Sequence, residues 1–195
     1  MADYKGLFTL MGAVLTLACY VPYFWGLYKK TLKPHMFSWL IWGVLMGIAC
    51  AAQITAGGGN GTLIMGLSSF FSLAIAAYAA YAGEKHITRS DYVRFVFACA
   101  SIPLWLATKN PLYAVTLISL IDVAAFWPTV RKSWSKPYEE SLPTFALAAC
   151  QLATSILALD TINLTTALYP ATLVLLNMSF CGLLVYRRRK LKVNF

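Results

Sequence analysis

Seven long apolar stretches, separated by short polar connections, dominate the pattern of the chain. Each is close to the length of about 20 residues that a helix needs to cross the hydrocarbon core of a bilayer. The apolar runs are continuous and lack the alternation expected of a barrel strand that faces lipid. The pattern therefore predicts seven transmembrane helices, at about residues 6–28, 36–56, 63–82, 92–108, 112–130, 141–159 and 164–186.

The composition agrees with a chain whose solvent is lipid. Hydrophobic residues make up 59% of the chain and charged residues only 12%, whereas soluble domains carry about 25% charged residues. The net charge is +9, and a high positive charge is also typical of nucleic-acid-binding domains. Here the basic residues lie at the ends of apolar stretches rather than along one soluble face. We therefore expect no nucleic-acid partner.

The basic residues also predict the orientation of the chain in the membrane. If the seven stretches all cross, 14 of the 16 Lys and Arg residues fall on one side, and only Lys5 and Lys109 fall on the other. Such a bias marks the cytoplasmic side. We expect a multi-pass protein of the plasma (bacterial inner) membrane, with its N-terminus outside and its C-terminus in the cytoplasm.

The first and fifth stretches end alike, which indicates an internal repeat. A shift of 103 positions places Lys29 on Lys132, Lys33-Pro34 on Lys136-Pro137, and Ser38 on Ser141. The third and seventh stretches match at a shift of about 108, with Tyr78 over Tyr186 and Ser69 over Asn177. An odd number of helices separates the two copies, so both keep the same direction across the membrane. The expected arrangement is two parallel repeats related by an axis along the membrane normal.

This layout resembles the PQ-loop and SWEET superfamily, and the chain also resembles a family of uncharacterised bacterial membrane proteins. The second resemblance rests on Pro34-His35, the run from Phe37 to Gly43, and the run from Arg131 to Trp134. The superfamily implies an all-α membrane fold with two three-helix repeats and a linker helix. The corresponding regions are 1–82 for the first repeat, 83–111 for the linker helix, and 112–195 for the second repeat with its basic tail.

The resemblance also implies a function, namely transport of a small solute by alternating access. A sugar or similar polar metabolite is the expected substrate, moved by a facilitator or a proton-coupled carrier. The chain departs from the superfamily signature, since Pro22 is followed by Tyr23 and Pro128 by Thr129 rather than by Gln. In SWEET carriers each of four pore helices has a proline, and Leu40 stands at one of those positions here.

Asp122 is the sharpest candidate for chemistry. It lies about ten residues into the fifth stretch, where a carboxylate costs at least about 2.5–3.5 kcal/mol on insertion scales. Such a group needs a cavity, a partner or a proton. It could couple transport to protons or bind a cationic or hydroxylated solute. The alternative is a buried, protonated acid that bonds a neighbouring group.

Other polar residues lie at similar depth. The resemblance to SWEET carriers implies that Asn177, and Ser69 with Ser68 in the first repeat, contact the substrate. Each could instead form a hydrogen bond between helices, typically worth about 0.6 kcal/mol. Gln53 and Gln151 either line the same cavity or bridge helices.

Aromatic and proline residues complete the candidate site. Trp42 suits stacking on a sugar or heterocycle but also suits the role of an interfacial anchor. Pro22 and Pro128 interrupt the helix hydrogen-bond ladder near corresponding ends. They could therefore act as hinges, or be kinks without a gating role.

The sequence contains no motif of an enzyme or a metal site. It has no HExxH motif, and its five cysteines form no CxxC pair. We expect no catalytic activity, cofactor or metal. The expected partners are a small-molecule substrate and the lipid bilayer, with a homo-oligomer as an open alternative. Two other functions remain open, a seven-helix receptor or sorting protein without transport, and a carrier of vitamins, nucleosides or amino acids.

Overall fold

The computed structural model describes residues 4–30, 34, 36–83, 89–135, 137–139 and 142–193. Within these residues the chain is all-helical, with seven α-helices, two short 3₁₀ turns and no strand. The α-helices are α1 (Tyr4–Tyr28), α2 (Met36–Thr55), α3 (Thr62–Ala82), α4 (Arg89–Thr108), α5 (Pro111–Ser135), α6 (Leu142–Leu157) and α7 (Leu164–Val193). The 3₁₀ turns are η1 (Gly59–Gly61) and η2 (Pro137–Glu139).

The helices begin close to the predicted positions, but two of them run further than the apolar pattern does. α5 continues to Ser135 and α7 to Val193, although the apolar stretches end near residues 130 and 186. Both extensions contain Lys and Arg, which have high helix propensity. Hydropathy predicts only the apolar part of a helix. The high helix propensity of Lys and Arg explains why α5 and α7 continue past that part.

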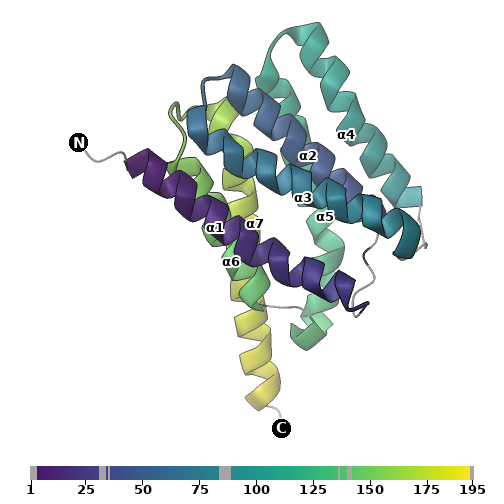
Figure 1. Ribbon diagram of the computed structural model, residues 1–195. Coiled ribbons are helices and arrows are strands. Elements are labelled where there is room, and N and C mark those ends of the chain that lie inside the picture. The colour runs from purple at the N-terminus through teal and green to yellow at the C-terminus, as the bar shows by residue number, and fades with distance from the viewer. Residues whose placement is uncertain are drawn as a thin grey trace.

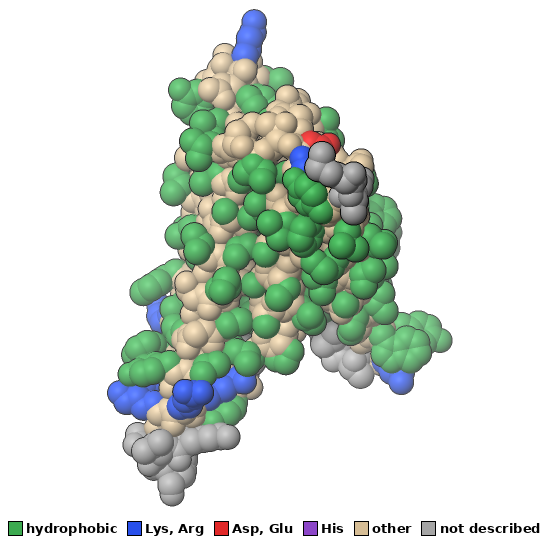
Figure 2. Space-filling model, turned by 90° about the vertical axis from the view of Figure 1, so that its left-hand side faces the viewer, with side chains coloured by type: hydrophobic (Ala, Val, Ile, Leu, Met, Phe, Trp, Pro, Cys, Tyr) green, Lys and Arg blue, Asp and Glu red, His purple; other side chains and the backbone are tan. Residues whose placement is uncertain are grey.

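Four of the helical segments are long and apolar enough to cross a membrane: Tyr4–Tyr28, Met36–Thr55, Gly59–Ala82 and Leu164–Leu191. Three shorter apolar segments follow at Phe95–Thr108, Pro111–Ala124 and Leu142–Leu157. Large apolar side chains are exposed along the helices, among them Leu106 at 72% and Leu175 at 66%. Figure 2 shows this hydrophobic surface between ends that carry Lys and Arg. Large exposed apolar areas are typical of surfaces that contact a membrane or another protein, and together with the long apolar helices they agree with a helical membrane protein.

Helix α4 lies at one side of the bundle (Figure 1), and we describe the other six helices as two units of three consecutive helices. In the first unit, α1–α3, helix α3 packs against both α1 and α2. In the second unit, α5–α7, helix α7 packs against both α5 and α6. α4 packs against α5 and α2. The two units meet where α1 packs on α6 and where α2 packs on α5.

These contacts have a two-fold pattern. Exchanging α1, α2 and α3 for α5, α6 and α7 converts the α1–α6 contact into α5–α2 and the α3–α6 contact into α7–α2. Every main contact within and between the units therefore has a counterpart. A pair of matching three-helix units related by a two-fold axis would produce this set of contacts.

The two units also run in the same direction. Lys5 at the start of α1 contacts Asp160 in the turn between α6 and α7, and we call this end of the molecule the Lys5 end. Arg188 near the end of α7 contacts Pro137 and Tyr138, which follow α5, and we call this the Arg188 end. α1 and α5 both begin at the Lys5 end, since α5 finishes beside Tyr138 and α6 returns from there to Asp160.

Small residues allow close packing in the core between the units. The main buried cluster joins α2, α5 and α7 with single contributions from α3, α4 and α6. It contains four almost inaccessible alanines: Ala49, Ala52, Ala98 and Ala114. In lipid, helices associate through such close van der Waals contact rather than through the hydrophobic effect.

Candidate functional site

Asp122 is buried in the second unit and has a specific partner. Its side chain is 5% exposed, and the hydroxyl of Tyr169 on α7 donates a 2.7 Å hydrogen bond to Oδ2. Tyr169 is itself only 1% exposed. A tyrosine hydroxyl can donate to the carboxyl group whether that group is charged or neutral. The cost of placing the carboxyl at this depth is therefore offset by a hydrogen bond from a neighbouring helix.

The first unit contains a network of hydroxyl groups at a comparable depth. Tyr20 Oη on α1 lies 2.8 Å from Ser72 Oγ and 3.2 Å from the carbonyl oxygen of Ser68, both on α3. The repeat shift of 103 positions places Cys19, the residue before Tyr20, on Asp122. The two units thus tie their first and third helices together with different chemistry.

Gln151 joins this network to the other unit. Its Nε2 donates a 2.6 Å hydrogen bond from α6 to the hydroxyl of Ser68, which in turn donates to the carbonyl of Ile64. Ser68 and Gln151 are 2% and 6% exposed. Two predicted site residues are therefore brought together, and the bond that joins them bridges helices.

Gln53 makes the corresponding bond from the first unit to the second. Its Nε2 donates a 2.7 Å hydrogen bond from α2 to the carbonyl of Thr166 on α7. Pro170 lies four residues later inside α7 and has no N–H, so the Thr166 carbonyl lacks its usual helical donor. Gln53 supplies that donor from another helix. Among the described residues Gln53 Oε1 has no hydrogen-bond partner.

Asn177 and Ser69, the matched pair of the repeat, both bond within their own units. Asn177 Nδ2 donates to the carbonyl of Leu173, one turn earlier in α7, at 2.7 Å. Ser69 Oγ donates to the carbonyl of Gly43 on α2 at 2.7 Å. Each side chain is 8% exposed. In this conformation both side chains are therefore buried between helices and hydrogen-bonded to backbone carbonyls.

Trp42 belongs to an aromatic cluster towards the Arg188 end of the first unit. Its ring is 41% exposed and meets the ring of Trp39 edge to face at 5.4 Å. Trp39 Nε1 in turn donates to Tyr23 Oη at 3.1 Å. The second unit has a matching cluster of Phe126, Phe145 and Phe180. The shift of 103 places Tyr23 on Phe126 and Trp42 on Phe145.

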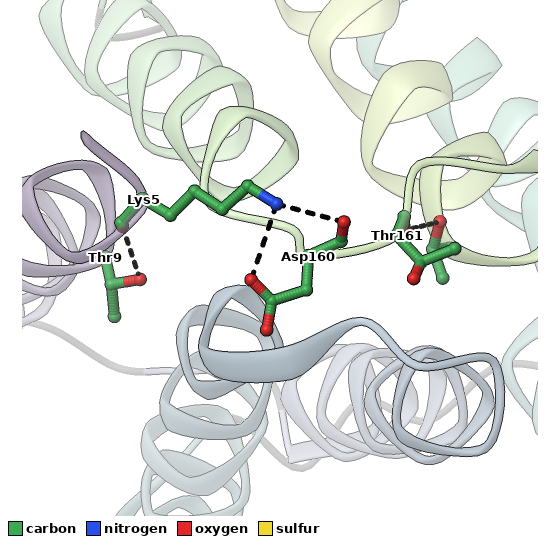
Figure 3. Close-up of polar contacts among 5 residues, drawn as sticks. Lys5, Thr9, Asp160 and Thr161 are labelled. Atoms are coloured by element: carbon green, nitrogen blue, oxygen red, sulfur yellow. Dashed lines mark hydrogen bonds and ion pairs between the residues drawn. The ribbon is translucent and has the colours of Figure 1, made fainter. Parts of the chain in front are cut away.

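The Lys5 end joins the two units through polar groups that sequence reasoning did not single out. Figure 3 shows Lys5 reaching from α1 to the turn that carries Asp160. Lys5 Nζ donates to the carbonyl of Asp160 at 3.0 Å and lies 3.5 Å from its Oδ1. The backbone N–H of Asp160 donates to the carbonyl of Gly58 at 2.9 Å. The sequence predicts only the side of the membrane on which Lys5 lies, because an ion pair between residues 155 positions apart leaves no local signal.

Glycines in the loop between α2 and α3 make this close approach feasible. Gly59 has a φ of +62°, a conformation that L side chains rarely adopt. A Cβ atom at Gly59 would overlap the carboxylate of Asp160, and one at Gly61 would lie 2.6 Å from backbone atoms of Ala158 and Leu159. The glycine run is a docking surface for the turn between α6 and α7.

Of the two candidate hinges, Pro22 and Pro128, the structure describes the side chain of Pro22 alone. Pro22 lies inside α1, where it lines a shallow apolar surface groove of about 410 Å³ with Trp25 and Tyr28. Pro128 lies in α5, but its side chain is outside the described residues. Pro170, which sequence reasoning did not name, has a demonstrable consequence because it frees the carbonyl that Gln53 binds.

The predicted substrate-binding residues lie outside the two surface grooves described in this structure. A second surface groove of about 450 Å³ lies between α6 and α7. Neither groove is lined by Asp122, Asn177, Ser69, Trp42 or the two glutamines. Within the described part of the chain, no three His, Cys, Asp or Glu side chains are grouped as metal ligands, and the five cysteines are free thiols.

Comparison with known proteins gave no match. No family model matches the chain, and neither a curated protein nor a solved structure does. The proposals below therefore rest on the contacts of the chain itself.

Proposed function

We propose that the chain is a membrane carrier for a small polar solute, such as a sugar, and that it works by alternating access. The observation that carries the proposal is the paired contact pattern of the two three-helix units. Two similar groups of helices that meet along one interface can rock against each other and open it first at one end and then at the other. Facilitated diffusion and proton coupling both fit this motion.

The distribution of polar contacts supports a state that is closed at the Lys5 end. The Lys5–Asp160 and Gly58–Asp160 contacts join the units at that end. Gln53–Thr166 and Gln151–Ser68 join them further into the bundle. Opening the Lys5 end requires all four contacts to break, and the two glutamine bonds lie on opposite sides of the two-fold pattern.

In this proposal Asp122 and Asn177 are buried in the present conformation and become accessible to the solute when the units separate. Each has a local partner, Tyr169 or the Leu173 carbonyl, that it can exchange for a solute hydroxyl when the units separate. An intramembrane carboxyl is a functional-site candidate by default. Ser69 plays the matching part in the first unit, and Trp42, which is already half exposed, provides a ring for stacking. Pro22 and Pro128 are the proposed bends of α1 and α5.

We further propose that the Lys5 end faces outwards in a bacterial inner membrane, with all seven helices crossing. α7 carries Arg187, Arg188, Arg189 and Lys190 in its last turns. The Lys5 end carries few basic residues, and one of them, Lys5, is paired with Asp160. The positive-inside rule favours placing the basic end in the cytoplasm.

The test is uptake by proteoliposomes against panels of sugars, amino acids, nucleosides and vitamin precursors. We expect at least one solute to be transported, and we expect Asp122→Asn and Asn177→Ala to lower its uptake at least ten-fold. Ser119→Ala and Thr172→Val are matched controls on the same helices, because both hydroxyls bond only to their own helix. Uptake that is unchanged by both site variants would overturn the assigned roles.

A second candidate, a receptor or sorting protein that binds without transport, is favoured by one observation. Asp122, Asn177 and Ser69 are all sealed by partners in their own units. The same panel separates the candidates, because a receptor would bind a ligand in a thermal-shift assay and give no net flux.

A further inference from the structure

The groove of about 450 Å³ between α6 and α7 lies outside the proposed solute path. It is lined by Leu142, Ala146, Cys181, Gly182, Val185 and Arg189, with Tyr186 beside them. A Cβ atom at Gly182 would have nothing within 4 Å. The groove is therefore a shallow apolar channel on the surface of the helices, beside Gly182, which has no side chain, and Ala146, which has a small one.

Three consecutive arginines follow the groove on α7, and they have different environments. Arg187 Nε donates to the carbonyl of Trp134 at 2.8 Å, and its guanidinium lies over the Trp134 ring. Arg188 Nε donates to the carbonyl of Pro137 at 3.0 Å, and its guanidinium lies over the ring of Tyr138. Arg187 therefore binds the end of α5, and Arg188 binds the 3₁₀ turn η2 that follows it. Arg189 is exposed, lines the groove, and has no hydrogen bond or ion pair with the described residues.

The position of Arg189 along α7 suits a lipid headgroup. From Leu164 to Val185 the helix rises about 32 Å, at about 1.5 Å per residue, which is close to the hydrocarbon thickness of a bilayer, about 30 Å. Tyr186 then stands where aromatic residues mark the membrane interface. Arg189 lies one turn beyond Val185, so its guanidinium is at the level of lipid phosphates while the groove lies at the level of acyl chains.

We propose that this groove binds one anionic phospholipid, with an acyl chain along Gly182 and Ala146 and the headgroup phosphate against Arg189. The guanidinium can form a bidentate hydrogen-bonded pair with phosphate. A free phosphate would use the charge but leave the apolar channel empty, which is why a lipid is the better occupant. The site depends only on the chain spanning a membrane and stands whether or not the chain transports a solute.

The test is native mass spectrometry of the full chain released from nanodiscs of phosphatidylcholine and phosphatidylglycerol. We expect the wild-type chain to retain phosphatidylglycerol in preference to phosphatidylcholine. Arg189→Gln should lower that preference about five-fold, the factor that corresponds to one interfacial charge. Lys190→Gln removes an equal charge from the next residue, outside the groove, and should have a clearly smaller effect.

A second variant tests the apolar part of the site. A Cβ atom at position 182 has open space around it, so we expect Gly182→Leu to place its side chain in the channel, to fold with an unchanged unfolding temperature and to lose the retained lipid. Equal retention of both lipids by the wild-type chain would overturn the proposal. So would equal effects of Arg189→Gln and Lys190→Gln, or full lipid retention by Gly182→Leu. Conversion of a dimer to a monomer by Gly182→Leu would also overturn it, because the groove would then hold a second copy.

Discussion

The first and second three-helix units have the same pattern of helix contacts but different polar interiors. In the first unit, Tyr20 joins α1 to α3 through Ser68 and Ser72. In the second unit, Asp122 joins α5 to α7 through Tyr169. The aromatic clusters at the Arg188 end also differ, since Trp42 in one unit corresponds to Phe145 in the other.

The comparison indicates that the arrangement of the helices in a unit does not depend on which polar side chains join its first and third helices. Small residues and apolar contacts are sufficient to repeat the arrangement of helices, so each unit is free to use different groups where its first and third helices meet. Only the second unit places a carboxyl group there. If the chain moves a solute, the ionisable part of the mechanism belongs to that unit, and the first unit offers hydroxyl groups alone.

The largest effect on stability is expected where the loop between α2 and α3 docks on the turn between α6 and α7. Gly59→Leu introduces a side chain at positive φ and against Asp160. The backbone conformation costs about 1–2 kcal/mol and the overlap about 1–3 kcal/mol, so we expect a loss of about 3 kcal/mol in the free energy of unfolding in mixed micelles. Gly182→Ala, at an open position, is the control and should change little. A Gly59→Leu protein as stable as the control would mean that the loops do not dock.

The difference between the units can be measured directly with two tyrosines. Tyr169→Phe leaves the buried Asp122 carboxyl without its donor, which costs about 1–3 kcal/mol. Tyr20→Phe removes one hydroxyl from a network in which Ser68 still bonds Gln151 and Ile64, so we expect a loss below about 1 kcal/mol. The same unfolding measurement compares them. Equal losses would contradict the distinction drawn between the carboxyl and hydroxyl interiors.

A similar pair tests the two glutamines that cross between the units. Gln53→Ala should cost about 1 kcal/mol and Gln151→Ala about 0.6 kcal/mol, within the range measured for hydrogen bonds between membrane helices. The order follows from Pro170, because the Thr166 carbonyl has no helical donor to replace Gln53. Pro170→Ala restores that donor and should reduce the cost of Gln53→Ala in a double-mutant cycle. Additive effects of the two changes would refute this explanation.

The smallest effect is expected from the ion pair at the Lys5 end. Lys5 and Asp160 side chains are 29% and 53% exposed, and exposed pairs contribute about 0–1 kcal/mol. Lys5→Met should therefore lower stability by less than about 1 kcal/mol, and added salt should remove most of the difference. A larger loss that salt does not change would show that Lys5 acts through packing.

The sequence predicts the positions of the helices well and the polar contacts between the helices poorly. Apolar length predicts the positions of α1 to α7, and four of the described helical segments are long and apolar enough to span a membrane. The extension of α7 to Val193 escapes this criterion because it depends on helix propensity outside lipid. The matching positions of Lys29 and Lys132 predict a repeat, which stays a prediction.

The candidate site could be predicted only as a set of residues. Hydropathy identifies Asp122 as an unusual group at membrane depth, but its partner Tyr169 lies 47 residues away and has no pattern of its own. The same is true of the bond from Gln53 to Thr166, whose cause is a proline four residues further along α7. Polar contacts between helices depend on rotation and register, which a single apolar pattern does not determine.

The most direct test of the central claim is whether the two units must separate at the Lys5 end for solute to cross. In a background without native cysteines, Lys5→Cys and Asp160→Cys can be joined by a short bismaleimide and assayed in proteoliposomes with a transported solute. We predict that the joined protein loses uptake, while each single-cysteine variant treated in the same way keeps it. Undiminished uptake by the fully cross-linked protein would contradict alternating access between the units.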